Sequence, residues 1–366
     1  MSAVAGLLLD PLDVLFFRGS RALGPQSPAE GSPPFPQTLA GALRTAMVKA
    51  AGADLSRLSR LRRESPGVPV KDLLARCGVP ATVLTARVRG PWFCRKAGDG
   101  IELLLPAPRA LRTDGERLLR VAVVDETSRA WAFLHRSVPL PEGLRRPLWA
   151  ASPRDLTPVT GYVTLDGLRE FLQGGVPRRG SLVEPGALFR FDRRIGIGMT
   201  SGRNTVEEGL LYATTKLCLA PGVKLYVELE GDPSCASLLD GGVVKLGGEG
   251  HGVRVERVER PRGGLEGWSV ASAGPRRMLV TVSPWAFGPG GLPSTLGTSL
   301  LAATVGKAQG HSGFDVALGG PRRNRWFAPA GSVFWIEGAL PEGVSLASTE
   351  EERAVGEGLF VTGAWS

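Results

Sequence analysis

The sequence predicts an α+β fold with a largely antiparallel sheet. Apolar runs typical of strands recur along the chain and dominate its second half, whereas the helical patterns are short. Strands separated only by short helices favour antiparallel pairing over the parallel sheet of strand-helix-strand units. No fixed-period repeat is visible, and the length of 366 residues favours two domains.

The N-terminal elements follow from a clear change in composition. Val4 to Leu9 form an apolar run that predicts a buried strand ending at Asp10-Pro11. The stretch from Gly19 to Pro36 is rich in Gly, Pro and Ser, which predicts a surface loop suited to binding. A helix is expected from Pro36, with Thr38 as its N-cap and with apolar residues at helical spacing at Leu39, Leu43, Met47 and Val48.

The rest of the chain alternates between strand patterns and breaks. The arginine-rich stretch from Asp54 to Arg63 precedes a proline-rich break and predicts a surface insertion. The basic, glycine-rich link from Gly174 to Gly180 predicts a boundary between domains 1–175 and 176–366. Further strands are expected at Thr82–Arg89, Ile101–Leu105, Leu118–Val124, Ala187–Arg193, Gly209–Leu219, Val223–Glu230, Val243–Leu246, Val253–Val258, Met278–Val282 and Ser332–Glu337, and short helices at Leu165–Leu172, Pro233–Leu239 and Pro293–Val305.

The charge balance favours a polyanionic partner. The formal net charge is +9 and the pI is near 9.9. Most of the cations are Arg, whose planar guanidinium grips phosphate oxygens in pairs and stacks on bases. A GC-rich genome also enriches Arg, Gly and Pro, so the charge alone does not decide between an RNA-binding protein and a biased composition.

Several classes of site are excluded or weakly supported. The four cysteines are far apart and form no C-x-x-C pair, so no metal site or disulfide framework is expected. Gly306-Lys307 lacks the rest of a phosphate-binding P-loop, and no dinucleotide fingerprint has the required spacing, so no cofactor is expected. The N-terminus lacks the features of a signal peptide and no apolar run spans a membrane, which predicts a cytoplasmic protein.

Three glycine-rich segments carry cations and read as an RNA surface. They are 193–198, 245–252 and 319–327. Glycine exposes backbone N–H groups to phosphates, Arg supplies charge, and the aromatic rings of Trp326 and Phe327 offer faces for base stacking. The last segment contributes the candidate RNA contacts Arg322, Arg323 and Arg325.

The chain resembles a known family along most of its length. The segments LLLDPLDVLFFRGSRALG and FPQTLAGALRTAM, then FDRRIGIGMTSGRNTVEEGLLY, KLGGEGHGVRV, GHSGFDVAL and FAPAGSVFWIEG, are similar in order and spacing to those of the third subunit of type III-B CRISPR Cmr effector complexes, a branch of the RAMP superfamily. The related Csm-type subunit is a close rival. The resemblance implies two ferredoxin-like, RRM-related domains with a glycine-rich loop near the sheet.

The resemblance also implies a function without catalysis. The subunit would cap the 5′ tag of the crRNA and dock the large polymerase-like subunit and the first backbone subunit, with no membrane contact. Gly41 would be needed for close helix packing. Carried over by position, the candidate RNA contacts are Arg18, Arg21, Arg44, Arg193, Arg194, Arg203, Lys245, Gly247, Gly248, Gly250 and His251.

Two alternatives stay open. A crRNA-processing endoribonuclease of the same superfamily would need a positioned general acid or base, and only His135 or His311 would serve. A purely structural scaffold would use exposed aromatic residues such as Trp92, Trp131 and Trp149 at protein interfaces, where Trp is enriched.

Overall fold

The chain folds into two compact units that are interleaved in sequence. The computed structural model describes residues 3–17, 31–98, 100–137, 139–199, 206–272, 274–287, 291–315 and 320–365. Unit 1 comprises 1–91, 186–259 and 310–325, and unit 2 comprises 92–185, 260–309 and 326–366. The chain passes between them at 91/92, 185/186, 259/260, 309/310 and 325/326. This organisation differs from the consecutive domains 1–175 and 176–366, because strands distant in sequence pair with one another.

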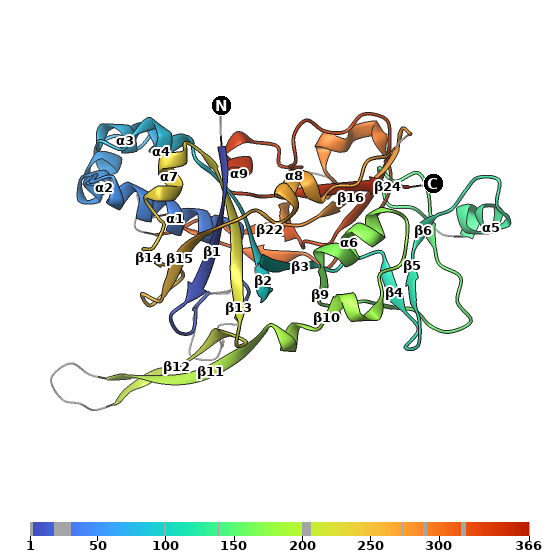
Figure 1. The fold of residues 1–366 in the computed structure, drawn as a ribbon, viewed down its shortest axis with the longest axis horizontal. Coiled ribbons are helices and arrows are strands. Elements are labelled where there is room, and N and C mark those ends of the chain that lie inside the picture. The colour runs from blue at the N-terminus through green and yellow to red at the C-terminus, as the bar shows by residue number, and fades with distance from the viewer. Residues whose placement is uncertain are drawn as a thin grey trace. The chain divides into compact units, whose positions relative to one another are not determined.

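Unit 1 is a five-stranded antiparallel sheet with helices and a long hairpin. The sheet order is β2-β13-β1-β15-β14, to which β2 contributes its first half. Its elements are β1 (Ala3–Pro11), α1 (Pro36–Ala50), α2 (Leu55–Glu64), α3 (Val70–Arg76), α4 (Ala81–Thr85), β2 (Arg87–Ala97), β11 (Phe189–Met199), β12 (Val206–Leu219), β13 (Val223–Gly231), α7 (Pro233–Ser237), β14 (Val243–Lys245), β15 (Gly252–Val258), β20 (Phe314–Asp315) and β21 (Gly320–Pro321). Figure 1 shows β11 and β12 as a long two-stranded ribbon.

The strand β1 lies inside the sheet and is apolar on both faces. It pairs with β13 on one side, with Leu7 opposite Val227, and with β15 on the other, with Leu9 opposite Val255. Leu7 and Leu9 are fully buried. A strand covered on both faces reads as a continuous apolar run, which is why the sequence predicted it correctly.

The helix α1 begins two residues earlier than the expected cap. Phe35, in an extended conformation, precedes the first helical residue, and Pro36 occupies the first turn. Proline suits that position because it lacks the N–H that would go unused there. Thr38 is therefore inside the helix and the N-cap prediction is wrong. The buried face contains Leu39, Leu43 and Met47, as the spacing predicted.

The arginine-rich insertion is helical and has a small core of its own. Helices α2 and α3 pack through Leu58, Leu73 and Cys77. Asp54 caps α2 by accepting a hydrogen bond of 2.9 Å from the backbone N–H of Ser56. The following segment was predicted as a strand from Thr82, but α4 covers Ala81–Thr85 and the strand begins only at Arg87.

Unit 2 contains two larger sheets and several short pairs. One sheet has the order β10-β9-β3-β2 and the other β18-β23-β16-β24. The elements are β3 (Gly100–Pro106), β4 (Leu111–Thr113), β5 (Leu118–Arg120), β6 (Ala122–Val123), α5 (Arg129–Ser137), β7 (Leu148–Trp149), β8 (Thr157–Pro158), β9 (Tyr162–Thr164), α6 (Leu165–Leu172), β10 (Leu182–Val183), α8 (Leu265–Trp268), β16 (Arg276–Thr281), β17 (Trp285–Ala286), β18 (Leu300–Thr304), β23 (Val333–Glu337), α9 (Glu350–Ala354) and β24 (Phe360–Ala364); β19 (Gln309–His311) and β22 (Arg325–Ala328) cross the unit boundaries.

The core of unit 2 surrounds the second sheet. Leu279, Trp285, Phe334 and Phe360 belong to one buried cluster. The helix expected over Pro293–Val305 is absent: a 3-10 turn over Ser294–Ser299 leads into β18, which pairs with β23. The architecture is therefore mixed, with antiparallel sheets and short helices, as predicted. Within the described part of the chain, no helix has the length and apolarity needed to cross a bilayer.

Candidate nucleic-acid interface

Three segments that are distant in sequence meet in unit 1. We call them the stem (residues 14–17, where the chain enters the first loop), the glycine segment (residues 245–252) and the hairpin (β11 and β12). Leu15 and Leu217 of β12 exchange backbone hydrogen bonds of 2.8 and 2.7 Å. The backbone N–H of Gly248 donates to the carbonyl oxygen of Phe16 at 2.9 Å. The stem is therefore bonded to both of the other segments.

The glycine segment requires glycine where it touches the stem. Gly247 has φ +84°, and a Cβ there would lie 2.4 Å from the carbonyl oxygen of Phe16. A Cβ at Gly248 would lie 2.9 Å from the Phe16 ring. Gly250 also has a positive φ, +76°, but nothing lies within 4 Å of its Cβ position. Two of the glycines thus permit close backbone approach, and the third permits the turn itself.

The hairpin presents a different chemistry on each face. Opposed residues of an antiparallel pair share a face, and successive residues alternate. Asp192 lies opposite Lys216 and Arg194 opposite Thr214, so one face is charged. The other face carries Phe191, Arg193 and Ile195; the first and last are 41 % and 69 % exposed.

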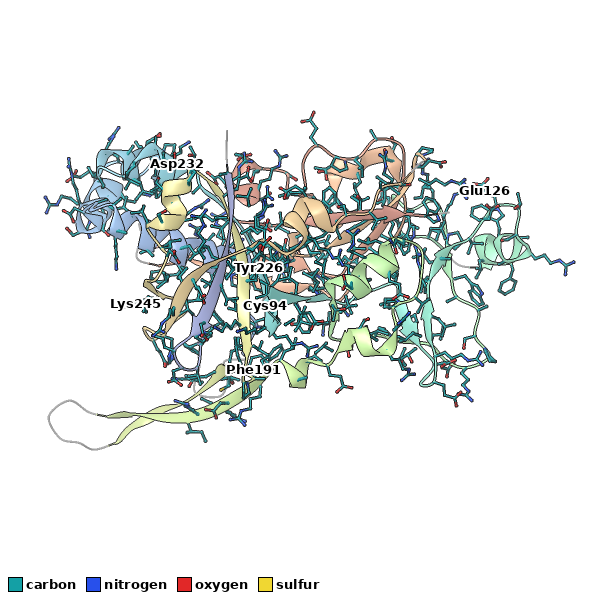
Figure 2. All side chains as sticks on the ribbon, viewed as in Figure 1. Cys94, Glu126, Phe191, Tyr226, Asp232 and Lys245 are labelled. Carbon is teal, nitrogen blue, oxygen red and sulfur yellow. The ribbon has the colours of Figure 1, made fainter. Side chains whose placement is uncertain are left out.

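The far end of the first loop returns to the same hairpin. A Cβ on Gly31 would lie 2.6 Å from the Phe191 ring and 3.0 Å from the Thr215 methyl group. Phe191 in turn makes an edge contact with Phe189 at a centroid distance of 5.5 Å. The loop therefore leaves from Phe17 beside the glycine segment and returns at Gly31 against the hairpin. Figure 2 labels Phe191 and Lys245 of this region.

Several cations in or beside this junction are paired with a carboxylate. Arg194 Nε is 2.8 Å from Asp192 Oδ2, Lys216 Nζ is 2.6 Å from Glu249 Oε2, and Lys224 Nζ is 2.8 Å from Asp10 Oδ2. The hydrogen bond to Asp192 raises the pKa of Arg194 further above its usual value.

Other exposed cations at the junction, such as Arg193 and Lys245, are not held in this way. Among the described residues, no carboxylate lies within ion-pair distance of Arg193 or Lys245, and both are exposed. Arg193 lies on the hairpin face that carries the exposed Phe191 ring, and Lys245 lies at the start of the glycine segment. The arrangement can bind a flexible polyanion whose planar groups stack.

The candidate residues divide into three groups. Arg193, Arg194, Lys245, Gly247, Gly248, Gly250 and His251 are brought together at the junction, whereas Arg18, Arg21 and Arg203 lie outside the described residues. Arg44 is half-buried, and its guanidinium donates to the carbonyl of Ala86 at 3.2 Å, which ties α1 to the end of α4. Arg322 and Arg323 are exposed and Arg325 is half-exposed, and none of them belongs to the three segments of the junction.

Two sequence-based roles are overturned by burial and space. Phe327 is fully buried and pairs with Ala286 in unit 2, so its ring offers no face for stacking, while Trp326 is 58 % exposed. Nothing lies within 4 Å of a Cβ position on Gly41, so close helix packing does not explain that glycine.

A model of the CRISPR-associated protein family Cas_Cmr3 matches residues 7–365, almost the whole chain. The chain belongs to this family. It is therefore a RAMP-type subunit of a type III-B CRISPR Cmr complex. A search of curated proteins finds no match to the sequence.

The fold is similar to that of solved subunits of type III CRISPR complexes. A chain of the cryo-EM structure of the type III-B Cmr-beta bound to cognate target RNA and AMPPnP superposes with a TM-score of 0.53 at 18 % identity, covering 90 % of this chain and 86 % of that one. The same complex with cognate target RNA gives 0.52 at 17 % identity, with the same coverages. A chain of the Csm3-Csm4 subcomplex of a type III-A complex gives 0.43 at 10 % identity, covering 97 % and 98 %.

The two histidines that the structure describes in full have different surroundings. His311 stacks on Phe35 at a centroid distance of 4.0 Å and is 7 % exposed, and burial lowers its pKa to about 4. His251 lies in the glycine segment, with its Nε2 3.8 Å from Glu249 Oε2. The side chain of His135 lies outside the described residues. No group of three potential metal ligands occurs within the described ranges.

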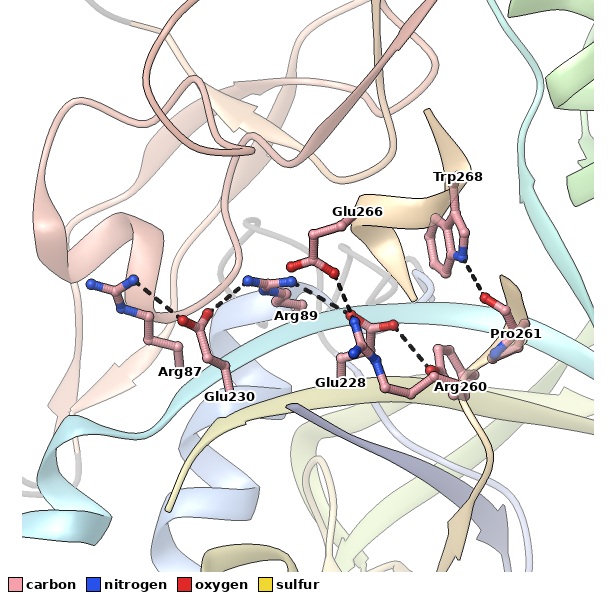
Figure 3. Close-up of polar contacts among 9 residues, drawn as sticks. Arg87, Arg89, Glu228, Glu230, Arg260, Pro261, Glu266 and Trp268 are labelled. Atoms are coloured by element: carbon pink, nitrogen blue, oxygen red, sulfur yellow. Dashed lines mark hydrogen bonds and ion pairs between the residues drawn. The ribbon is translucent and has the colours of Figure 1, made fainter. Parts of the chain in front are cut away.

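A buried charge network connects β2 and β13 in the sheet of unit 1 (Figure 3). Glu228 on β13 is fully buried, lies 3.6 Å from the guanidinium of Arg89 on β2, and accepts a hydrogen bond of 3.1 Å from Tyr226. Arg89 also contacts Glu230 at 2.7 Å. The alternation of Arg87 and Arg89 along β2 therefore serves internal pairing with β13, and these two arginines are absent from the proposed RNA surface.

Lys216 belongs to the junction but was not among the residues predicted from the sequence. It lies in β12, its side chain is only 11 % exposed, and its amine pairs with Glu249. A lysine within a buried strand requires a partner of opposite charge, because a desolvated ammonium is costly. That requirement was the signal available in the sequence.

Proposed function

We propose that this subunit binds the single-stranded 5′ tag of the crRNA at the junction of the stem, the glycine segment and the hairpin. The observation that supports this most directly is the meeting of these three segments at the base of the first loop. Each brings a group that suits RNA: exposed backbone, cations, and an aromatic ring. A short single strand offers splayed bases and phosphates, which loops of this kind bind better than a helix in a groove does.

The proposal assigns distinct tasks to the exposed groups. Arg193 and Lys245 would contact phosphates, and the ring of Phe191 would stack on a base. Arg18 and Arg21 belong to the loop that follows the stem, and the proposal includes them and Arg203 as further phosphate contacts. It also includes two ferredoxin-like domains.

A second part of the proposal concerns protein partners. Phe133 and Trp149 of unit 2 are 68 % and 50 % exposed, and large exposed aromatic side chains are typical of protein interfaces. We assign this region to docking of the large polymerase-like subunit or the first backbone subunit. Trp92 does not contribute, because it is buried and its indole N–H donates to the carbonyl of Val282 at 2.8 Å.

Catalysis of crRNA cleavage receives no support from the described histidines. His311 is buried against Phe35, so its imidazole is not presented to a ribose. A general acid or base must come within hydrogen-bond reach of the proton that it transfers. The non-catalytic role is therefore the function that we propose.

Binding of a tag RNA and a scrambled RNA across a salt series tests this function. If about four phosphates are neutralised, the logarithm of the affinity falls against the logarithm of salt with a slope near −3, since each single-strand contact contributes about 0.7. The measurement is made with and without the large subunit, and cleavage is followed in the same samples. A flat salt response would refute RNA binding, and cutting that is lost in His135→Ala would favour the nuclease.

A further inference from the structure

The carboxylate of Glu249 occupies a position that suits a phosphate. One of its oxygens lies 2.6 Å from the ammonium nitrogen of Lys216 and 3.8 Å from Nε2 of His251. The Nε2 atom is inaccessible to solvent and makes no hydrogen bond within the described residues. The side chains of Lys216 and His251 are 11 % and 15 % exposed, whereas that of Glu249 is 43 % exposed. The ammonium group of Lys216 and the imidazole nitrogen of His251, both nearly buried, thus face one oxyanion that reaches solvent.

We propose that Lys216 and His251 form a phosphate site in which Glu249 is the resident anion, and that an RNA phosphate displaces it. This inference rests on the RNA-binding function proposed above. Carboxylates and phosphates are both accepted by lysine through short charge-assisted hydrogen bonds, so the exchange preserves the contact at Lys216. The site adds Lys216 to the RNA-binding residues and gives Glu249 a regulatory role.

Lys216 and Glu249 differ in how firmly their backbone is held. Lys216 is fixed in the ladder of β12, opposite Asp192, whose own carboxylate is held by Arg194. Glu249 stands between two glycines and adopts φ +56°, an uncommon conformation for a residue with a side chain. No other atom lies within 4 Å of a Cβ on the neighbouring Gly250. The acid can therefore move away while the lysine stays in place.

The resident carboxylate also explains how a nearly buried lysine is tolerated in the RNA-free subunit. An ammonium removed from water without a partner is strongly destabilising. Glu249 supplies the partner, and it makes a phosphate compete for the site. A single strand that contacts Lys245 at the same time competes well, whereas free inorganic phosphate with one contact competes poorly. The device favours RNA over small anions.

Glu249→Gln tests the displacement directly, with Glu256→Gln as the matched control. Glu256 is exposed on β15 and loses the same charge. Affinity for a fluorescein-labelled single-stranded RNA of about eight nucleotides is measured by anisotropy at about 0.15 M salt, where distant charges are screened. We expect Glu249→Gln to tighten binding about three- to tenfold and Glu256→Gln to change it by less than about twofold, since the competing ion pair is lost only in the first. Equal effects of the two substitutions would overturn the displacement.

A double-mutant cycle shows whether Glu249 acts through Lys216. Lys216→Gln is expected to weaken binding and to lower the salt slope by about 0.7, the value of one phosphate contact. In the Lys216→Gln background, Glu249→Gln should give no gain, and a gain that persists would refute the inference. Thermal unfolding of each variant identifies any loss of fold. Glu256→Gln shows how much of the change in affinity comes from the loss of one negative charge alone. If the wild-type protein binds no RNA, the proposed function fails as well; if it binds but the cycle shows no coupling, only this inference fails.

Discussion

Gly247→Ala should loosen the contact between the glycine segment and the stem. Two costs can be separated from the structure. A side chain at φ +84° costs about 1–2 kcal/mol, and a Cβ placed 2.4 Å from a backbone carbonyl forces a displacement that costs about 1–3 kcal/mol more. Gly250→Ala is the control, because its φ is +76° and its Cβ position is open. It should lose only the first amount.

Urea denaturation of both variants measures the difference. The free energy of unfolding should be lower in Gly247→Ala than in Gly250→Ala by about 1–3 kcal/mol. Affinity for the tag RNA should fall by about tenfold or more in Gly247→Ala, because the displaced segment carries Lys245 and His251. Equal stabilities of the two variants would refute the assignment of Gly247 to close backbone approach. Equal RNA affinities of the two variants would show that this contact is not needed for RNA binding.

Three further predictions follow from single residues. Arg193→Glu should weaken RNA binding about tenfold or more while Arg60→Glu, an equal charge change on exposed α2, has little effect; anisotropy with each variant decides, and equal losses would contradict the site. Burial lowers the pKa of His311 from 6.5 to about 4. Between these two pH values the imidazole is therefore protonated in the unfolded chain and neutral in the folded chain. Stability should therefore fall by up to about 3 kcal/mol as the pH drops from 6.5 to 4, and His311→Phe, which keeps the stacking, should flatten that part of the urea-midpoint profile. Glu228→Gln, in the buried network, should lower the free energy of unfolding by about 2 kcal/mol, whereas Glu102→Gln, in an exposed pair, should change it by less than about 1 kcal/mol; similar values would contradict the role of burial.

Much of the secondary structure was predictable where one local pattern dominates. The apolar spacing over Leu165–Leu172 gave a helix with both ends correct, and the run of β1 gave a buried strand. The helix prediction over Pro293–Val305 was wrong because the apolar residues there fit either a helix or a strand. Pairing of Leu300–Thr304 with β23, together with the kink at Gly297, decides for a strand, and neither is visible locally.

The interleaving of the two units was not predictable from composition. The glycine-rich link at 174–180 resembles a domain linker, yet it lies within unit 2. The first strand of the chain pairs with β13 and β15, more than 200 residues away in sequence. Pairing over such distances leaves no trace in local periodicity.

The residue types of the candidate site were predictable from the sequence, but the pairing of its charged side chains was not. Glycine and arginine mark the segments that meet, because close approach and phosphate binding each demand a specific residue type. Which arginines remain exposed could not be predicted: Arg44 is half-buried against Ala86, and Arg194 is held by Asp192. Lys216 was overlooked because the acid that accompanies it is 33 positions further along the chain.

The five passages of the chain between the units have a practical consequence for mapping experiments. Neither unit corresponds to one continuous stretch of sequence, and the strand β2 belongs to both. No cut at a single position therefore separates one unit from the other. Deletion series, which assign binding regions in proteins with consecutive domains, would report misfolding in this one. Point substitutions and crosslinking on the intact chain are the means by which its RNA and protein contacts can be located.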